Sequence, residues 1–265
     1  MVRRREISRA STGQYAGDYF TPPRPRILAH RGFALEVPEN TLLAFLKALS
    51  AGATHLETDV RASADGVAVL SHDPDLLRLA GRSVRVGDLT MAELRRIDLG
   101  HGQSFVSLAE ALDAFPEARF NIDIKTAAAE QPAARAILDA RGTARVLITS
   151  FSERRRRRTV SALRGVATSA SVSRFVWALI GARLGLAPLV RLALRSIDAV
   201  QVPERSGILR VITPRIVRAM HAAGVEVHVW TVNDPSDMIR LLDAGVDGLV
   251  TDRCDLARAV AITRS

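Results

Sequence analysis

Cysteine is nearly absent from this sequence. Cys254 is the single cysteine among 265 residues, so the chain cannot form an internal disulfide. This composition fits a reducing compartment and favours a cytoplasmic location. No histidine stands near Cys254 in the sequence, and we therefore expect a packing residue there rather than a catalytic thiol.

Aromatic residues and long uncharged apolar runs are also scarce. Aromatics make up 5% of the chain and no nucleic-acid recognition motif is present, so we expect no nucleic-acid partner although the net charge is +9. The most apolar stretch, residues 175–194, contains Arg183, Arg191 and Pro188. Two charges and a proline within 20 residues argue against a transmembrane helix.

The first 25 residues lack the apolar core of a secretory signal. They are polar, rich in arginine and punctuated by glycine and proline, which predicts a flexible basic arm over residues 1–25. The remaining residues, 26–265, are numerous enough for one large domain with a sizeable core, since 48% of the chain is apolar.

Apolar strand-like runs alternate with amphipathic helical stretches along this domain, a pattern typical of a mostly parallel sheet. The length fits a (β/α)₈ TIM barrel. There are nine candidate strands for the eight places of a barrel, so one of them must lie outside it. The candidates are residues 27–30, 54–60, 67–73, 120–125, 145–151, 166–171, 198–203, 225–232 and 246–252. Only 12 residues separate Asp59 from His72, too few for a crossover helix. We therefore expect an irregular barrel around strands two and three, with a small insertion after the third.

Four polar clusters mark residues 27–73: His30-Arg31-Gly32, Pro38-Glu39-Asn40-Thr41, Glu57-Thr58-Asp59 and His72-Asp73. Glu57 and Asp59 are two apart and point to the same face of a strand. Two carboxylates on one face repel each other unless a cation lies between them, and a hard divalent cation is the usual one. The alternative is a solvent-facing acidic pair beside Arg61.

Two histidines, His30 and His72, flank this acidic pair in the sequence. Imidazoles are suited to proton transfer near neutral pH. Arg31 adds a guanidinium that can bind a phosphate or a carboxylate through two nitrogens.

In this order and spacing, the four clusters resemble the glycerophosphodiester phosphodiesterase family. The spacing from Asp59 to His72 also resembles the catalytic stretch of phosphatidylinositol-specific phospholipases C, a related barrel. The resemblance continues through NIDIK (121–125), ITSF (148–151), VWTVN (229–233) and DGLVTD (247–252), and covers roughly residues 26–256.

The resemblance implies a divalent metal, Mg²⁺ or Ca²⁺, held by Glu57, Asp59 and Asp123. The family usually has Glu at the third position, so Asp123 is one methylene shorter, and a salt bridge to Lys125 is its alternative role. His30 and His72 would be the general acid and base.

The remaining expected site residues bind substrate. Arg31 and Lys125 would hold the phosphate. Glu39 would bind metal or substrate, or else order its loop. Trp230 would stack on the alcohol, or else belong to the barrel core.

The implied reaction is hydrolysis of a glycerophosphodiester to sn-glycerol 3-phosphate and an alcohol. Alternatives are a lysophospholipase D-like or phospholipase C-like activity on lipid phosphodiesters, and a catalytically silent barrel that binds membranes. The complete set of His30, His72, Glu57 and Asp59 argues against the silent barrel.

The charge is unevenly distributed. Residues 153–195 contain ten arginines and one acidic residue, Glu153, a net charge of +9 that equals that of the whole chain. Beside the apolar run 175–194, this segment suits an anionic membrane surface and a peripheral location. The alternative is an outer barrel helix with a solvated basic face.

Overall fold

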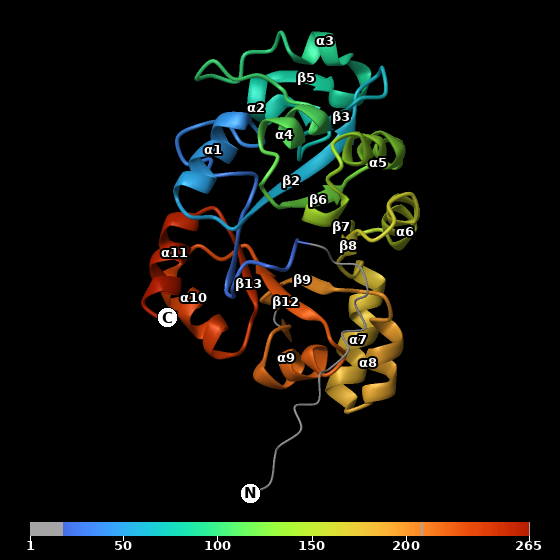
Figure 1. Ribbon diagram of the computed structural model, residues 1–265, viewed down its shortest axis with the longest axis vertical. Helices are drawn as coiled ribbons and strands as arrows, with labels where there is room; N and C mark the ends of the chain where they lie inside the picture. The colour runs from blue at the N-terminus through green and yellow to red at the C-terminus, as the bar shows by residue number, and fades with distance from the viewer. Residues whose placement is uncertain (1–17, 208, 265) are drawn as a thin grey trace, which may run out of the picture.

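The computed structural model describes residues 18–207 and 209–264, and in this part of the chain eight parallel strands form a barrel (Figure 1). Their order is β8-β7-β6-β2-β1-β13-β12-β9, and a bridge between Ser169 and Ala199 joins the two outer strands. The predicted TIM barrel is therefore confirmed. The strands are β1 (Arg26–Ala29), β2 (His55–Ala62), β6 (Phe120–Ile124), β7 (Val146–Thr149), β8 (Ala167–Thr168), β9 (Ala199–Pro203), β12 (Glu226–Trp230) and β13 (Gly248–Thr251).

The candidate strand outside the barrel is the third one. β3 (Ala68–Leu70) pairs antiparallel with β2, with Val69 opposite Arg61. The turn between them contains Asp65-Gly66, and Gly66 has a φ of 77°, a conformation that glycine adopts at low cost. With so few residues for the connection, the chain reverses instead of crossing over, and the expected irregularity is confirmed.

A small insertion follows β3, as predicted, and lies at the top of Figure 1. It consists of β4 (Asp75–Leu76), α2 (Leu77–Ala80), β5 (Arg82–Arg85), η1 (Val86–Asp88) and α3 (Met91–Leu94). Its apolar side chains form a cluster separate from the main core, which includes Leu76, Val86, Met91, Leu94 and Phe105. This cluster fixes the insertion next to the end of β2.

Side-chain caps set the starts of several outer helices. Thr41, Ser152 and Thr213 each accept a hydrogen bond from the backbone N–H three residues on, and Thr90 forms a capping box with Glu93. The remaining elements are α1 (Leu42–Ser50), α4 (Leu108–Ala114), η2 (Ala127–Ala129), α5 (Glu130–Asp139), η3 (Thr143–Arg145), α6 (Glu153–Ser161), α7 (Val172–Leu184), α8 (Ala187–Ala193), β10 (Arg205–Ser206), β11 (Leu209–Arg210), α9 (Pro214–His221), α10 (Pro235–Asp243) and α11 (Cys254–Ile262).

The basic and apolar segment 153–195 folds into α6, α7 and α8, which lie on one flank of the barrel (Figure 1). Gly185 ends α7 in the left-handed conformation with a φ of 75°. The apolar run 175–194 is therefore divided between two short helices that pack on each other. Within the described residues, no helix is long and apolar enough to cross a membrane.

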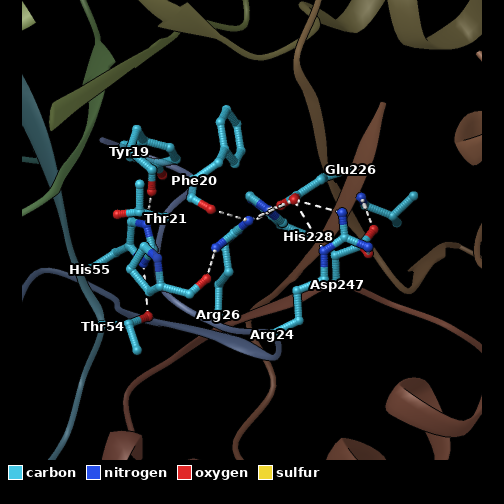
Figure 2. Close-up of polar contacts among 12 residues, drawn as sticks. Tyr19, Phe20, Thr21, Arg24, Arg26, Thr54, His55, Glu226, His228 and Asp247 are labelled. Carbon is cyan, nitrogen blue, oxygen red and sulfur yellow. Dashed lines mark hydrogen bonds and ion pairs between the residues drawn. The ribbon is translucent and has the colours of Figure 1, made fainter. Parts of the chain in front are cut away.

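The segment before β1 is packed at the amino-terminal end of the barrel (Figure 2). Residues 1–17 of the expected arm lie outside the described residues. The Tyr19 side chain is fully buried, with its ring 4.6 Å from that of His55. Arg24 and Arg26 both pair with Glu226 at the start of β12, at 2.9 and 2.7 Å. These contacts hold residues 19–26 against the amino-terminal end of the barrel, called the barrel floor below.

Candidate active site

A cavity of about 540 Å³ opens at the carboxyl ends of the barrel strands. Eight of the nine residues singled out in the sequence line this cavity, and Glu39 does not. The eight are His30, Arg31, Glu57, Asp59, His72, Asp123, Lys125 and Trp230.

His30 follows β1 and is held by a carboxylate that the sequence did not single out. Its Nδ1 donates to Asp252 Oδ1 at 2.8 Å, and Asn233 donates to the other oxygen of Asp252. Burial lowers the pKa of His30, but the hydrogen bond to Asp252 and the charge of Glu57 outweigh it and raise the pKa. With Nδ1 engaged, Nε2 is the nitrogen left for proton exchange.

His72 follows β3 and is held in the same way by its neighbour. Its Nδ1 donates to Asp73 Oδ1 at 2.7 Å, and Arg78 Nε donates to Asp73 Oδ2 at 2.6 Å. Burial raises the pKa of Asp73, but the hydrogen bonds from His72 and Arg78 outweigh burial, and the pKa is lower than that of a free aspartate. The cavity therefore has two imidazoles, each oriented by an aspartate.

An acidic cluster lies between strands β2 and β6. Asp59 on β2 is directly opposite Asp123 on β6, and Lys125 Nζ lies 2.7 Å from an oxygen of each. The salt bridge considered as the alternative role of Asp123 is therefore formed. The backbone N–H of Arg31 donates to Glu57 Oε2 at 2.9 Å. Burial and the nearby charge of Asp59 raise the pKa of Glu57.

The chemistry of these carboxylates fits a hard divalent cation. Asp123 Oδ1 is buried without a hydrogen-bond partner, and burial raises the pKa of Asp123. Asp59 Oδ2 makes no hydrogen bond and is ion-paired with Arg31 Nε at 3.3 Å. Carboxylate oxygens are the ligands that Mg²⁺ and Ca²⁺ prefer, and a cation would offset the repulsion among them. Over residues 18–207 and 209–264, no three acidic, histidine or cysteine side chains are close enough together to hold a metal ion. The side chain of Asp123 is shorter than the glutamate that the resemblance implies there.

The polar motifs also contain residues that fix the backbone of the site. Arg31 has a φ of 58° and Gly32 a φ of 86°, and a Cβ on Gly32 would lie 2.7 Å from the Ala44 side chain. Only glycine therefore lets α1 pack this close. Asn40, buried with a φ of 56°, accepts from Thr58 Oγ1 at 2.7 Å. That bond ties the loop before α1 to the strand that carries both Glu57 and Asp59.

Glu39 is engaged by two arginines at the rim of the site. Arg78 donates to its two oxygens at 2.6 and 2.9 Å, and Arg31 Nη1 donates at 3.2 Å. Of the roles considered for Glu39, these contacts favour ordering its loop. Arg78 thereby connects the Glu39 loop to the Asp73–His72 pair.

The other half of the cavity is apolar. Trp230 is half-buried at the end of β12, its ring 6.2 Å from that of Phe151, and lines the cavity. Phe151 also faces the Lys125 ammonium, 5.9 Å from the ring centre. The sequence singled out Trp230 but missed Phe151 and the cavity residues of α7. Cys254 is buried with no role in the cavity, and burial raises its pKa to about 11, as expected for a packing thiol.

Fold and site together define the class: an α/β-barrel enzyme with ionisable side chains gathered at the carboxyl ends of its strands. A sequence profile of the glycerophosphoryl diester phosphodiesterase family matches residues 30–256, and the chain belongs to this family. A relative from Mycobacterium tuberculosis (strain ATCC 25618 / H37Rv), named "Probable glycerophosphodiester phosphodiesterase 2", is 46% identical over 89% of this chain and 90% of its own length.

Solved structures show the same fold. A putative glycerophosphoryl diester phosphodiesterase from Silicibacter pomeroyi has a TM-score of 0.79 at 24% identity, covering 94% of this chain and 98% of its own. A phosphodiesterase from Oleispira antarctica, in complex with the product sn-glycerol-3-phosphate, has a TM-score of 0.72 at 23% identity, covering 90% of this chain and 97% of its own.

Proposed function

We propose that this chain hydrolyses glycerophosphodiesters to sn-glycerol 3-phosphate and an alcohol in the cavity described above. The observation that carries the proposal is the orientation of both cavity histidines by carboxylates: Asp252 for His30 and Asp73 for His72. The named activity of the Mycobacterium tuberculosis relative and the product held by the Oleispira antarctica structure support the same reaction.

The two histidines divide the proton transfers. One imidazole takes the proton of the attacking hydroxyl, which belongs to water or to the free 2-hydroxyl of glycerol. The other gives a proton to the departing alkoxide, a poor leaving group unless it is protonated. The aspartates hold each ring in the tautomer and orientation that this exchange requires.

Arg31 and Lys125 bind the phosphate, and Trp230 stacks on the alcohol. When a divalent cation, Mg²⁺ or Ca²⁺, is held by Glu57, Asp59 and Asp123, it supplies charge stabilisation at a non-bridging phosphate oxygen. Asp123 would hold this cation directly or through a water, which Mg²⁺ tolerates readily.

The test is release of sn-glycerol 3-phosphate from glycerophosphocholine, with Mg²⁺, Mn²⁺ or Ca²⁺ added to chelator-treated protein. We expect turnover that requires one of the cations. A folded protein that cleaves no glycerophosphodiester with any of the three would support the catalytically silent barrel instead.

We also propose that the chain is a cytoplasmic protein that binds anionic membrane surfaces through α6, α7 and α8. These three helices lie on one flank of the barrel (Figure 1). Their exposed side chains include both arginines and large apolar residues. Trp177, Leu184 and Leu192 are 57%, 67% and 66% exposed. The exposed arginines of residues 153–195 are Arg154, Arg157, Arg158, Arg164, Arg183, Arg191 and Arg195.

Liposome co-sedimentation tests this second proposal. Replacing Arg154, Arg157 and Arg158 by glutamine should clearly weaken the preference for anionic over neutral vesicles, because each arginine near such a surface contributes about 1 kcal/mol. The matched control replaces three exposed arginines of the insertion, Arg82, Arg85 and Arg96, and should keep the preference. Equal and negligible binding of the wild type to both vesicle types would leave α6 as an outer helix with a solvated basic face.

A further inference from the structure

Two neutral amide side chains border the cavity, and the proposed reaction gives them no role. Asn121 is on β6 and Gln201 is on β9. Gln201 Nε2 donates to Asn121 Oδ1 at 3.0 Å, so the two amides form a pair across the barrel. Asn121 comes two residues before Asp123 on the same strand, which places it about 6–7 Å deeper in the barrel than that carboxylate.

The fully buried ring of His228 holds Gln201 from the neighbouring strand β12. An amide nitrogen can only donate, so His228 Nδ1 accepts from Gln201 Nε2 at 3.2 Å. The other ring nitrogen, Nε2, lies 3.1 Å from Glu226 Oε2 and donates to it. A Cβ on Gly248 would lie 2.8 Å from the His228 ring, so only glycine at that position leaves room for the ring. His228 therefore carries its proton on Nε2.

Glu226, the acceptor of that proton, is held at the barrel floor by two arginines. Arg26 donates to both of its oxygens, each at 2.7 Å, and Arg24 donates to one of them at 2.9 Å (Figure 2). A carboxylate paired in this way can only accept, which excludes the other tautomer of His228. The ion pairs at the floor thus fix the orientation of the amide pair.

This chain of hydrogen bonds leaves one acceptor and one donor for the cavity. Both hydrogens of Gln201 Nε2 are used, so Gln201 Oε1 is the free acceptor. Asn121 accepts through Oδ1, so its Nδ2 is the free donor. Over residues 18–207 and 209–264 neither free atom has a hydrogen-bond partner, and neither is fully buried, so both are open to the cavity. A hydroxyl group matches this pair, because it accepts and donates at once.

We infer that Asn121 and Gln201 bind the terminal hydroxyl of the glycerol half of the substrate and make the enzyme selective for it. This inference rests on the proposed function. The hydroxyl accepts from Asn121 Nδ2 and donates to Gln201 Oε1. With the phosphate at Arg31 and Lys125, the terminal oxygen is the part of glycerol that reaches one layer deeper, whereas the 2-hydroxyl stays beside the phosphate. The leaving alcohol does not fit this description, since choline carries a cation and no second hydroxyl.

The experiment compares kcat/KM for two diesters of phosphocholine. One is glycerophosphocholine, and the other is the diester of propane-1,2-diol esterified at its primary oxygen, which lacks only the terminal hydroxyl. The 2-hydroxyl and the leaving group are the same in both, so the chemistry of the bond that breaks is unchanged. Loss of two hydrogen bonds corresponds to kcat/KM about 10 to 100 times lower for the propanediol diester.

The outcomes separate the inference from the proposed function. A preference of fivefold or more for glycerophosphocholine supports the inference. A smaller preference would overturn the inference and leave the proposed function standing. No turnover of either diester with any of the three cations would refute both.

Variants assign the preference to the amide pair. Gln201→Met keeps the length of the side chain and removes both amide atoms, so the preference should fall close to one. Both substrates are measured on one preparation, so partial unfolding does not change their ratio. His228→Phe should also lower the preference, although His228 does not border the cavity, because the Gln201 amide is then free to turn.

The matched control is Gln131→Met, because Gln131 is exposed on α5 and does not border the cavity. This variant should keep the preference of the wild type. An unchanged preference in Gln201→Met would contradict the inference, whatever the absolute rate of that variant.

Discussion

Arg78 connects the two parts of the site that the sequence motifs supply separately. It donates to both oxygens of Glu39 and to Asp73, the carboxylate that orients His72. We predict that Arg78→Ala lowers kcat although Arg78 does not border the cavity. The reason is that Asp73 and Glu39 lose the cation that holds both side chains in position.

The expected magnitude follows from the exposure of Arg78, whose side chain is 49% exposed. An ion pair in water contributes about 0.2–1 kcal/mol, and Arg78 engages two carboxylates. A loss of about 1–2 kcal/mol in transition-state stabilisation corresponds to a rate about 5 to 30 times lower. The loss should affect kcat and kcat/KM alike, because His72 acts in the transition state.

The assay is steady-state hydrolysis of glycerophosphocholine, with thermal unfolding as a check of the fold. Arg78→Lys should recover part of the rate, since an ammonium can pair with one carboxylate but cannot bind two oxygens in a fork. Arg95→Ala is the matched control: Arg95 pairs with Glu110 at the surface, 51% exposed, and its loss should leave kcat unchanged.

A double variant separates positioning from general destabilisation. In a His72→Ala background, Arg78→Ala should cost much less than in the wild type, because the ring that Asp73 orients is gone. Wild-type kcat in Arg78→Ala, or an undiminished effect in the double variant, would refute the role of Arg78 through His72.

Three further predictions concern the site and its support. Glu57→Gln and Asp59→Asn should each lower turnover strongly in a folded protein, and full activity in excess chelator would contradict the metal proposal. His30→Ala and His72→Ala should each lower kcat by about 10²–10⁴, with a bell-shaped pH profile in the wild type, and near-normal kcat in either variant would reject its role. At the barrel floor, burial raises the pKa of Glu226, but the bonds from Arg26 and His228 outweigh it and lower the pKa. The stability that Glu226 contributes should therefore be present above its unfolded pKa and be lost as the pH falls below about 4.5. Glu226→Gln should destabilise the fold at neutral pH by about 3–5 kcal/mol, because Arg26 is left buried without its partner. The variant should also lose less stability in acid than the wild type does. The measurement is the free energy of unfolding in urea at several pH values, and a pH dependence equal to that of the wild type would contradict this prediction.

The alternation of strands and helices could be predicted because each local signal agrees with the barrel. Short apolar runs such as 225–232 and 246–252 contain β12 and β13, and capped amphipathic stretches lie between the runs. The third candidate strand was harder to place. Apolar content alone does not distinguish β3, antiparallel and outside the barrel, from a parallel barrel strand.

Asp73 lies next to His72 in the motif, but Asp252 and Arg78, the other residues that hold the two histidines in position, could not be found in the same way. Asp252 is 222 positions from His30 in the sequence, and only the pairing of β1 with β13 brings them together. Arg78 belongs to an insertion whose position depends on its own apolar cluster. A motif records which side chains are present, whereas their partners depend on how the barrel closes.

The arginine run shows a second limit of sequence patterns. Five consecutive arginines, 154–158, suggest a uniformly basic surface, but a helix distributes them around its axis. Arg156 is 3% exposed and donates to Glu153 and Thr168, and Arg155 donates to Ser150 across the end of β7. The bonds from Arg156, together with those from Ser171 and Arg174, lower the pKa of Glu153 to about 2 although burial alone would raise it. Two of the five charges are thus engaged in holding α6 to the barrel. Attraction to an anionic surface should therefore scale with the three exposed arginines of α6 and not with five.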